Sequence, residues 1–155
     1  MRRAARQKSL LHPLSRLAGD FRERIRRGLR VRGHALQPAH SSVLIHLKGE
    51  GRRLTELAES AGITKQAMGK LVDELEQIGY VERVPDRDDG RAKIVRFSKK
   101  GRALLRDSGQ IVDTIWDDYA ALVGEPRLAR LRDTLHLLLE RIDAEAAPGT
   151  EGKDR

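Results

Sequence analysis

Residues 54–80, LTELAESAGITKQAMGKLVDELEQIGY, contain two helical patterns that Gly62 separates. Apolar positions recur at helical spacing in both patterns: Leu57, Ala58 and Ala61 in the first, and Met68, Leu71, Val72, Leu75 and Ile78 in the second. Two helices joined by a tight turn can pack these faces together and present the second helix to the major groove of DNA. The stretch therefore predicts a helix-turn-helix.

The outer face near the start of the second helix is small and polar. Thr64 stands at the N-cap position, and Lys65, Gln66, Gly69 and Lys70 follow it. Glutamine can read the edge of adenine, and lysine can reach guanine or a phosphate. A glycine inside a helix costs about 1 kcal/mol relative to alanine, so Gly69 suggests a close approach by another backbone or by DNA. A merely solvated helix face is the alternative.

The pattern changes to that of strands after Gly79. The runs YVERV, residues 80–84, and KIVRF, residues 93–97, flank the turn-rich segment PDRDDGRA. This predicts a hairpin whose tip carries Arg87, Asp89, Arg91 and Lys93. An arginine on such a tip suits a narrow minor groove, and a neighbouring aspartate can orient its guanidinium. An ordinary exposed turn is the alternative, but the position after a helix-turn-helix favours a wing.

Helical patterns also flank this region, which makes the predicted fold mainly α with a small β-hairpin wing. We expect a flexible basic arm over residues 1–12, a helix over about 13–32, a short helix over 38–48, two helices over 99–146 and a disordered tail from 147. Ser98 can cap the helix that ends at Gly124, and Pro126 suits the first turn of the last helix. Residues 13–146 are thus predicted to form one domain, with the winged helix-turn-helix at about 38–98.

Charge is distributed unevenly along the 155 residues. Residues 1–32 carry 11 Lys and Arg against 2 Asp and Glu, whereas residues 107–155 carry 6 against 11, and the whole chain has a formal charge of +8. Phosphate would be attracted to the first part and repelled by the last. Basic surfaces also serve RNA, membranes and solubility, so the charge alone does not decide among these partners.

The stretch from residue 54 to 105 resembles the MarR family of bacterial and archaeal regulators. The resemblance lies in the LA pair of the first helix, LVDELEQIGYVER, the wing ending in DGRA, and the closing S-x-x-G. It implies that Thr64, Lys65, Gln66, Gly69 and Lys70 occupy the recognition-helix positions, that Arg91 is the wing-tip arginine, and that Asp89 orients it. Gly69 departs from a frequent Ser or Thr, and Gly90 from a frequent second arginine.

A reader of two half-sites about 34 Å apart needs two-fold symmetry. We therefore expect a homodimer, held by the helices at the two ends, on a pseudo-palindromic double-stranded operator. The predicted contact residues are Leu14, Leu17, Phe21, Ile115, Tyr119, Leu131, Leu135, Leu138 and Ile142. The resemblance also implies a small-molecule effector, for which His12, Arg16 and His46 are candidate pocket residues.

The sequence offers no support for catalysis, a cofactor or a metal site. The chain has no cysteine, and its five histidines are scattered without a paired-ligand spacing. Without an apolar run of 18 residues or a signal-peptide pattern, we expect a cytoplasmic protein. The predicted function is a sequence-specific transcription repressor. Two alternatives stay open: a nucleoid-associated protein of low specificity, and a winged helix that contacts only proteins or serves an enzyme as an accessory module.

Overall fold

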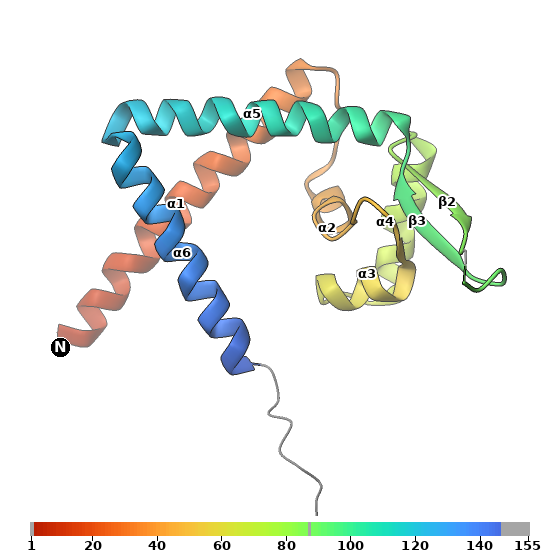
Figure 1. Cartoon of the computed structure of the whole chain (residues 1–155), viewed down its shortest axis with the longest axis horizontal. Coiled ribbons are helices and arrows are strands. Elements are labelled where there is room, and N and C mark those ends of the chain that lie inside the picture. Colours follow the sequence, from red (N-terminus) through yellow and green to blue (C-terminus); the bar gives the residue numbers. More distant parts are fainter. Residues whose placement is uncertain (1, 87, 147–155) are drawn as a thin grey trace, which may run out of the picture. The chain divides into compact units, whose positions relative to one another are not determined.

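The computed structural model describes residues 2–86 and 88–146, with side chains from Leu10 to Glu145 except Arg87 (Figure 1). It is mostly helical and has one small antiparallel sheet, as predicted. The chain divides into two compact units, residues 1–112 and 113–155. The predicted disordered tail, residues 147–155, lies outside the described residues.

The first helix, α1 (Arg2–Val31), is longer than predicted and corrects the flexible arm expected over residues 1–12. The prediction placed Pro13 at the start of the helix, where proline is favoured. In the structure Pro13 lies inside α1. Alanine, arginine, lysine and leucine are strong helix formers, and they surround this proline. The helix therefore continues across it despite one lost backbone hydrogen bond.

The helix-turn-helix consists of α3 (Leu54–Ala61) and α4 (Lys65–Gln77). Gly62 ends α3 in the left-handed conformation with φ 65°, which glycine adopts without strain. Thr64 then caps α4, because its side chain accepts a hydrogen bond from the backbone N–H of Ala67 at 3.2 Å. The predicted cap is therefore present.

The predicted helix over residues 38–48 is two shorter elements. A single 3₁₀ turn, η1 (Pro38–His40), leads into α2 (Ser41–Leu44). A turn follows α2, and Leu47 after it is buried.

The wing is a hairpin of β2 (Val81–Pro85) and β3 (Lys93–Phe97), paired antiparallel with Val81 opposite Phe97 and Pro85 opposite Lys93. A third strand, β1 (Arg52–Arg53), pairs with the other edge of β3. β1 was not predicted, since two consecutive arginines have no apolar alternation to indicate a strand.

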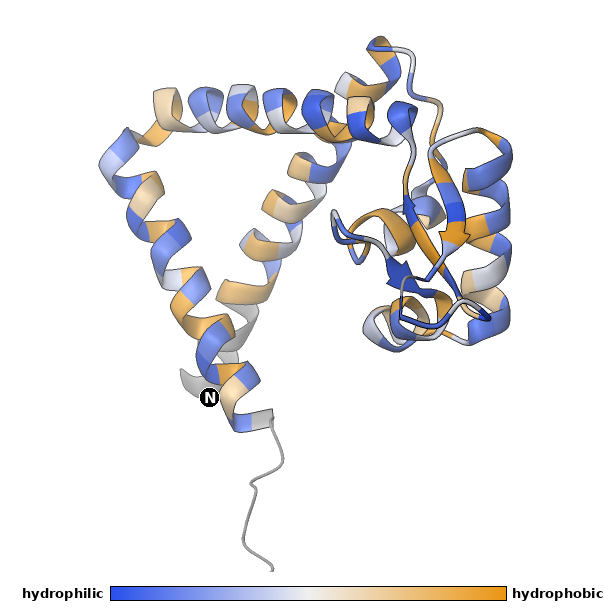
Figure 2. Ribbon diagram, turned by 45° about the vertical axis from the view of Figure 1, so that its right-hand side comes forward, coloured by the Kyte–Doolittle hydropathy of each residue, from blue (hydrophilic) through white to orange (hydrophobic). Residues whose placement is uncertain are grey.

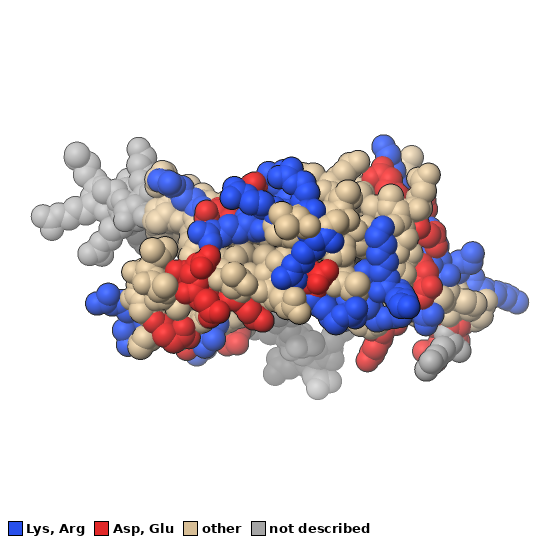
Figure 3. Space-filling model, turned by 90° about the horizontal axis from the view of Figure 1, so that it is seen from above, with Lys and Arg blue, Asp and Glu red and all other residues tan. Residues whose placement is uncertain are grey.

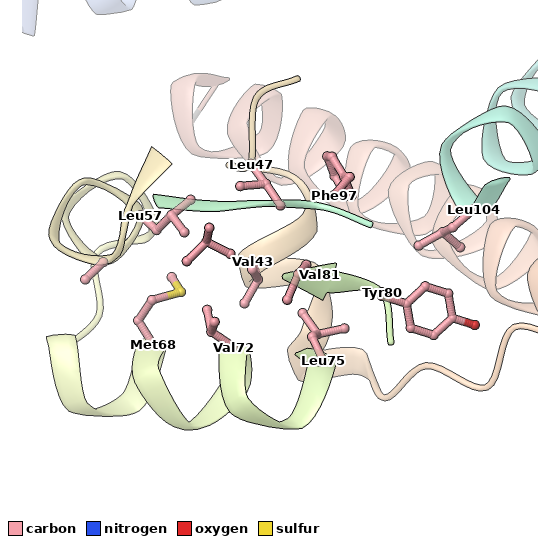
Figure 4. Packing of buried hydrophobic residues seen from close by; sticks show 12 residues of the cluster. Val43, Leu47, Leu57, Met68, Val72, Leu75, Tyr80, Val81, Phe97 and Leu104 are labelled. Carbon is pink, nitrogen blue, oxygen red and sulfur yellow. The ribbon is translucent and has the colours of Figure 1, made fainter. Parts of the chain in front are cut away.

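Apolar side chains from the helix-turn-helix and the wing share one core (Figure 4). Its members include Val43, Leu57, Met68, Val72, Leu75, Tyr80, Val81, Val95, Phe97 and Leu104, all buried. The faces predicted to join the two helices of the motif thus pack together, except that Ile78 at the end of α4 is exposed. The polar face of α4 is left outside the core.

The helix α5 (Lys99–Val123) begins against the sheet. Ser98 accepts a hydrogen bond from the backbone N–H of Gly101 at 3.1 Å and donates its own hydroxyl to the carbonyl of Gly79 at 2.5 Å. A side chain at Gly101 would place its Cβ 2.1 Å from the carbonyl oxygen of Tyr80. Glycine is therefore required here for the close approach of α5 to the start of β2.

Residues 113–146 comprise the rest of α5 and α6 (Glu125–Ala146). The indole N–H of Trp116 donates to the Glu125 carboxylate at 3.0 Å, and the Arg132 guanidinium lies over the Trp116 ring at 5.3 Å from its centre. Both helices alternate apolar and polar residues along their length (Figure 2). No helix among the described residues is long and apolar enough to cross a membrane.

Candidate nucleic-acid interface

The exposed face of α4 carries the residues predicted to read DNA. Lys65, Gln66 and Lys70 are exposed in the first two turns of the helix, and Gln66 and Lys70 face away from the buried core residues Met68 and Val72. The capped N-terminus adds backbone N–H groups and the positive end of the helix dipole. The geometry therefore presents cationic and amide groups from a helix that is itself fixed by the core.

Gly69 lies on the edge of this face and is half-buried. A Cβ added there would have its nearest neighbour in the Leu54 side chain, at an ordinary contact distance of 3.7 Å to Cδ2. No other part of the described chain approaches Gly69 closely. No backbone segment of the described chain therefore makes the close approach to Gly69 that the sequence suggested.

An ion pair that the sequence analysis did not predict fixes the base of the wing. The Arg53 guanidinium donates to Asp86 Oδ2, with Nε at 2.7 Å and Nη2 at 2.6 Å. Asp86 Oδ1 also accepts the backbone N–H of Asp88 at 3.0 Å. The hydrogen bond from Asp88 and the Arg53 guanidinium together hold the pKa of Asp86 below its usual value. Asp86 thus joins β1 to the start of the wing tip.

The wing tip is arranged differently from the prediction. Asp89 does not orient the Arg91 guanidinium: its Oδ1 accepts the backbone N–H of Arg91 at 3.1 Å, and its Oδ2 lies 3.9 Å from Arg53 Nη2. The Arg91 and Lys93 side chains are exposed, and neither has an ion pair with another described residue. Arg87 lies outside the described residues.

Two further contacts hold α4 in place. The Arg83 guanidinium of β2 pairs with Asp73 at 2.6 Å and with Glu76, both on α4. The ring of His40 is buried, with Nε2 at 3.1 Å from the Glu74 carboxylate and Nδ1 accepting the backbone N–H of Gln37 at 3.2 Å. The wing and the segment before α2 therefore both anchor the recognition helix.

A second histidine links α1, the wing and α5. His34 is buried, its Nε2 lies 2.8 Å from Asp107 Oδ2, and its Nδ1 lies 3.0 Å from the Tyr80 hydroxyl. The hydrogen bond from His34, and beyond it the charge of Arg32, hold the pKa of Asp107 below its usual value. Burial raises the pKa of Tyr80. Neither buried histidine was predicted to have a partner, because their partners lie 34 to 73 residues away in the sequence.

A cavity of about 700 Å³ lies between α1, the segment before α2, α2 and the first part of α5. Apolar walls come from Ile25, Leu29, Leu36, Leu44, Ile45, Leu104 and Leu105. Arg22, Arg26, Arg30 and His34 supply polar groups, and so does Glu23, which pairs with Arg26. His12, Arg16 and His46, the predicted pocket residues, do not line this cavity. The histidine that does line it, His34, is also the one bonded to Tyr80.

Several predicted dimer residues are exposed in the single chain. Leu17, Leu131, Leu138 and Ile142 are 37%, 40%, 52% and 57% exposed, whereas Ile115 is buried. Leu14, Phe21, Tyr119 and Leu135 are half-buried. Because Ile115 is already covered within one chain, it cannot contribute much new contact with a second one.

Charged side chains of both signs share the surface of the molecule. On the face seen in Figure 3, Lys and Arg gather in several groups with Asp and Glu between them. Within α1, Arg24 pairs with Asp20 at 2.9 Å and Arg26 pairs with Glu23. Part of the basic excess of residues 1–32 is thus neutralised on the helix itself.

Known proteins share this arrangement. Residues 35–92, which span the segment before α2 through the wing tip, match the model of the MarR family. A crystal structure of a MarR-family transcriptional regulator from Rhodococcus sp. RHA1 is 28% identical, with a TM-score of 0.64 over 85% of this chain and 93% of that one. These matches support a MarR-family winged-helix regulator.

Two further relatives are informative, one by its named function and one by its bound ligand. The transcriptional activatory protein BadR of Rhodopseudomonas palustris is 29% identical over 93 residues, which cover 60% of this chain but only 52% of BadR. CouR of Rhodococcus jostii RHA1, whose structure contains p-coumaroyl-CoA, is 28% identical, with a TM-score of 0.61 over 90% of this chain and 92% of CouR. BadR is named as a transcription regulator and not as an enzyme. The described residues contain no group of three or more His, Cys, Asp or Glu side chains that could hold a metal ion.

Proposed function

We propose that this chain is a double-stranded DNA-binding transcription regulator that acts as a homodimer on a pseudo-palindromic operator. The observation that carries the proposal is the capped first half of α4, which exposes Lys65, Gln66 and Lys70 beside a wing with an exposed Arg91. Gln66 would read base edges in the major groove, while Arg91 and Lys93 would contact the backbone and the minor groove.

The two copies would join through α1, α5 and α6. Exposed leucines on α1 and α6 support this arrangement, since a row of half-exposed leucines is costly in water unless a partner covers it. We leave Ile115 out of the proposed contact because it is buried in one chain. The other predicted residues, Leu14, Leu17, Phe21, Tyr119, Leu131, Leu135, Leu138 and Ile142, remain in it.

We further propose that the chain is a repressor and that a small ligand modulates its binding to DNA. The cavity beside α1 suits a ligand with an apolar body and an anionic group, because its walls are apolar and Arg22 and Arg30 border it besides the Arg26–Glu23 pair. CouR, with its bound p-coumaroyl-CoA, supports this class of ligand. Since His34 lines the cavity and bonds Tyr80 at the start of the wing, a ligand there would act on the DNA-binding part directly.

Selection of bound duplexes from a random pool tests DNA binding, specificity and symmetry in one experiment. The proposal expects an enriched inverted repeat with half-sites one helical turn apart. Enrichment of no sequence, with tight binding to all duplexes, would instead favour the low-specificity nucleoid protein. Absence of any DNA binding would favour a winged helix that contacts only proteins or acts as an enzyme accessory module.

A further inference from the structure

We propose that Gly69 and Leu54 form an apolar notch beside the reading face of α4 that receives the 5-methyl group of a thymine. This inference rests on the proposed DNA binding and names the base contact that Gly69 makes. It assigns a reading role to a residue that carries no side chain.

The fold itself does not require glycine at position 69. Its φ is not positive, and an added Cβ would meet only Leu54 Cδ2 at 3.7 Å. Gly101 is the contrasting case, because a Cβ there would lie 2.1 Å from a backbone oxygen. An alanine at position 69 would fit the chain and would favour the helix more than glycine does. The reason for glycine therefore lies outside the folded chain.

The position of Gly69 places it beside the proposed reading residues. It lies three residues after Gln66 and four after Lys65, which puts all three on neighbouring positions of one helix face. A side chain at position 69 would extend the helix surface next to Gln66. Because glycine has no side chain, space remains next to Gln66, and a base edge in the major groove of the DNA could approach the backbone of α4 there.

The chemistry of the notch indicates which group fills it. Its floor is the Leu54 methyl carbon Cδ2, and Leu54 is a half-buried residue at the first position of α3. A phosphate or an amino group placed against this carbon would lose water without gaining a hydrogen bond. The thymine methyl is the one apolar group on the major-groove edges of the four bases. Because Gln66 suits adenine, the thymine is expected in the same base pair or in the next one.

The test uses the selected operator and replaces its thymines one at a time with uracil, which lacks the methyl group. For the wild-type protein, we expect one position in each half-site to lose about fourfold in affinity, the value for one buried methyl group. Substitution of the other thymines should change affinity much less. Fluorescence anisotropy measures these affinities.

Gly69→Ala fills the notch and should reverse this preference. The variant should bind the thymine operator several-fold more weakly than wild type, and uracil at that position in both half-sites should restore most of the lost affinity. Its Tm should be higher than that of the wild type, because alanine favours the helix. Gly109→Ala is the matched control: Gly109 lies inside α5 with no atom within 4 Å of an added Cβ. It should raise Tm and leave DNA affinity unchanged.

Three results would overturn the inference. Gly69→Ala could bind the thymine operator as tightly as wild type, or its Tm could fall, which would mean that the fold needs this glycine. The affinity that Gly69→Ala loses relative to wild type could also be the same on every uracil duplex. That result would indicate a contact between Gly69 and the DNA backbone or a phosphate. A wild-type protein that binds no DNA at all would instead refute the proposed function, so the two failures are distinguishable.

Discussion

At the scale of single residues, α4 and the wing tip carry different kinds of contact. Gln66→Ala should relax the preference at one base pair in each half-site and cost about 1–3 kcal/mol on the best sequence, with little effect on random DNA. Arg91→Ala should weaken binding to all sequences and lower the salt slope by about 1 per wing, since the exposed guanidinium neutralises phosphate charge. A salt series on the selected operator and a scrambled duplex measures both effects. An unchanged slope for Arg91→Ala would mean that the wing tip does not contact DNA.

Asp107 connects a single carboxylate to acid stability. Its pKa is lowered in the folded chain by His34, so it stabilises the fold at pH values above its unfolded pKa of about 3.9. This stabilisation is lost as the pH falls through the lower folded pKa. Asp107→Asn should therefore unfold at lower urea concentration than wild type at pH 7, and the two midpoints should converge toward pH 3.

Asp113→Asn provides the comparison for this series, because the Asp113 carboxylate is exposed and has no ion pair with another described residue. Its urea midpoint should follow that of the wild type at every pH. If Asp107→Asn behaved in the same way, the bond between His34 and Asp107 would contribute nothing to stability.

At the scale of elements, the sequence predicted what local chemistry determines. Gly62 and Thr64 mark the turn of the motif by backbone conformation and capping, and both roles are confirmed. β1 was missed because it has no strand pattern of its own. It is a strand only through its pairing with β3. The buried bonds of His34 and His40 were missed for a related reason: they join residues distant in sequence, which no periodicity can place together.

Two glycines of α5 test how closely this helix approaches the sheet. Gly101→Ala should lower the free energy of unfolding by about 3 kcal/mol, because its Cβ would clash with the Tyr80 carbonyl, and backbone atoms cannot move aside as a flexible side chain can. Gly109→Ala should raise the same quantity by up to about 1 kcal/mol through helix propensity alone. Urea unfolding measures both values, and a stabilised Gly101→Ala would contradict the contact between α5 and Tyr80.

At the scale of the whole molecule, the proposed dimer explains why apolar side chains remain exposed on the terminal helices. Leu138 and Leu137 are consecutive residues of α6 with nearly equal exposure, 52% and 54%. Only Leu138 shares the stripe of Leu131, Leu135 and Ile142, because a helix turns by about 100° per residue. Sequence periodicity could identify this stripe, but it could not separate the residues that one chain buries, such as Leu128 and Ile115, from those left for a partner.

This pair of leucines therefore gives a matched test of the assembly. Sedimentation equilibrium at micromolar concentration should find the wild type and Leu137→Glu as dimers, because position 137 lies away from the stripe. Leu138→Glu should dissociate toward the monomer, since a carboxylate buried in an apolar contact is strongly unfavourable. The affinity of Leu138→Glu for the operator should fall as the dimer dissociates, because one copy reads only one half-site. A wild-type chain that sediments as a monomer, or equal dissociation by both substitutions, would contradict the stripe as the dimer contact.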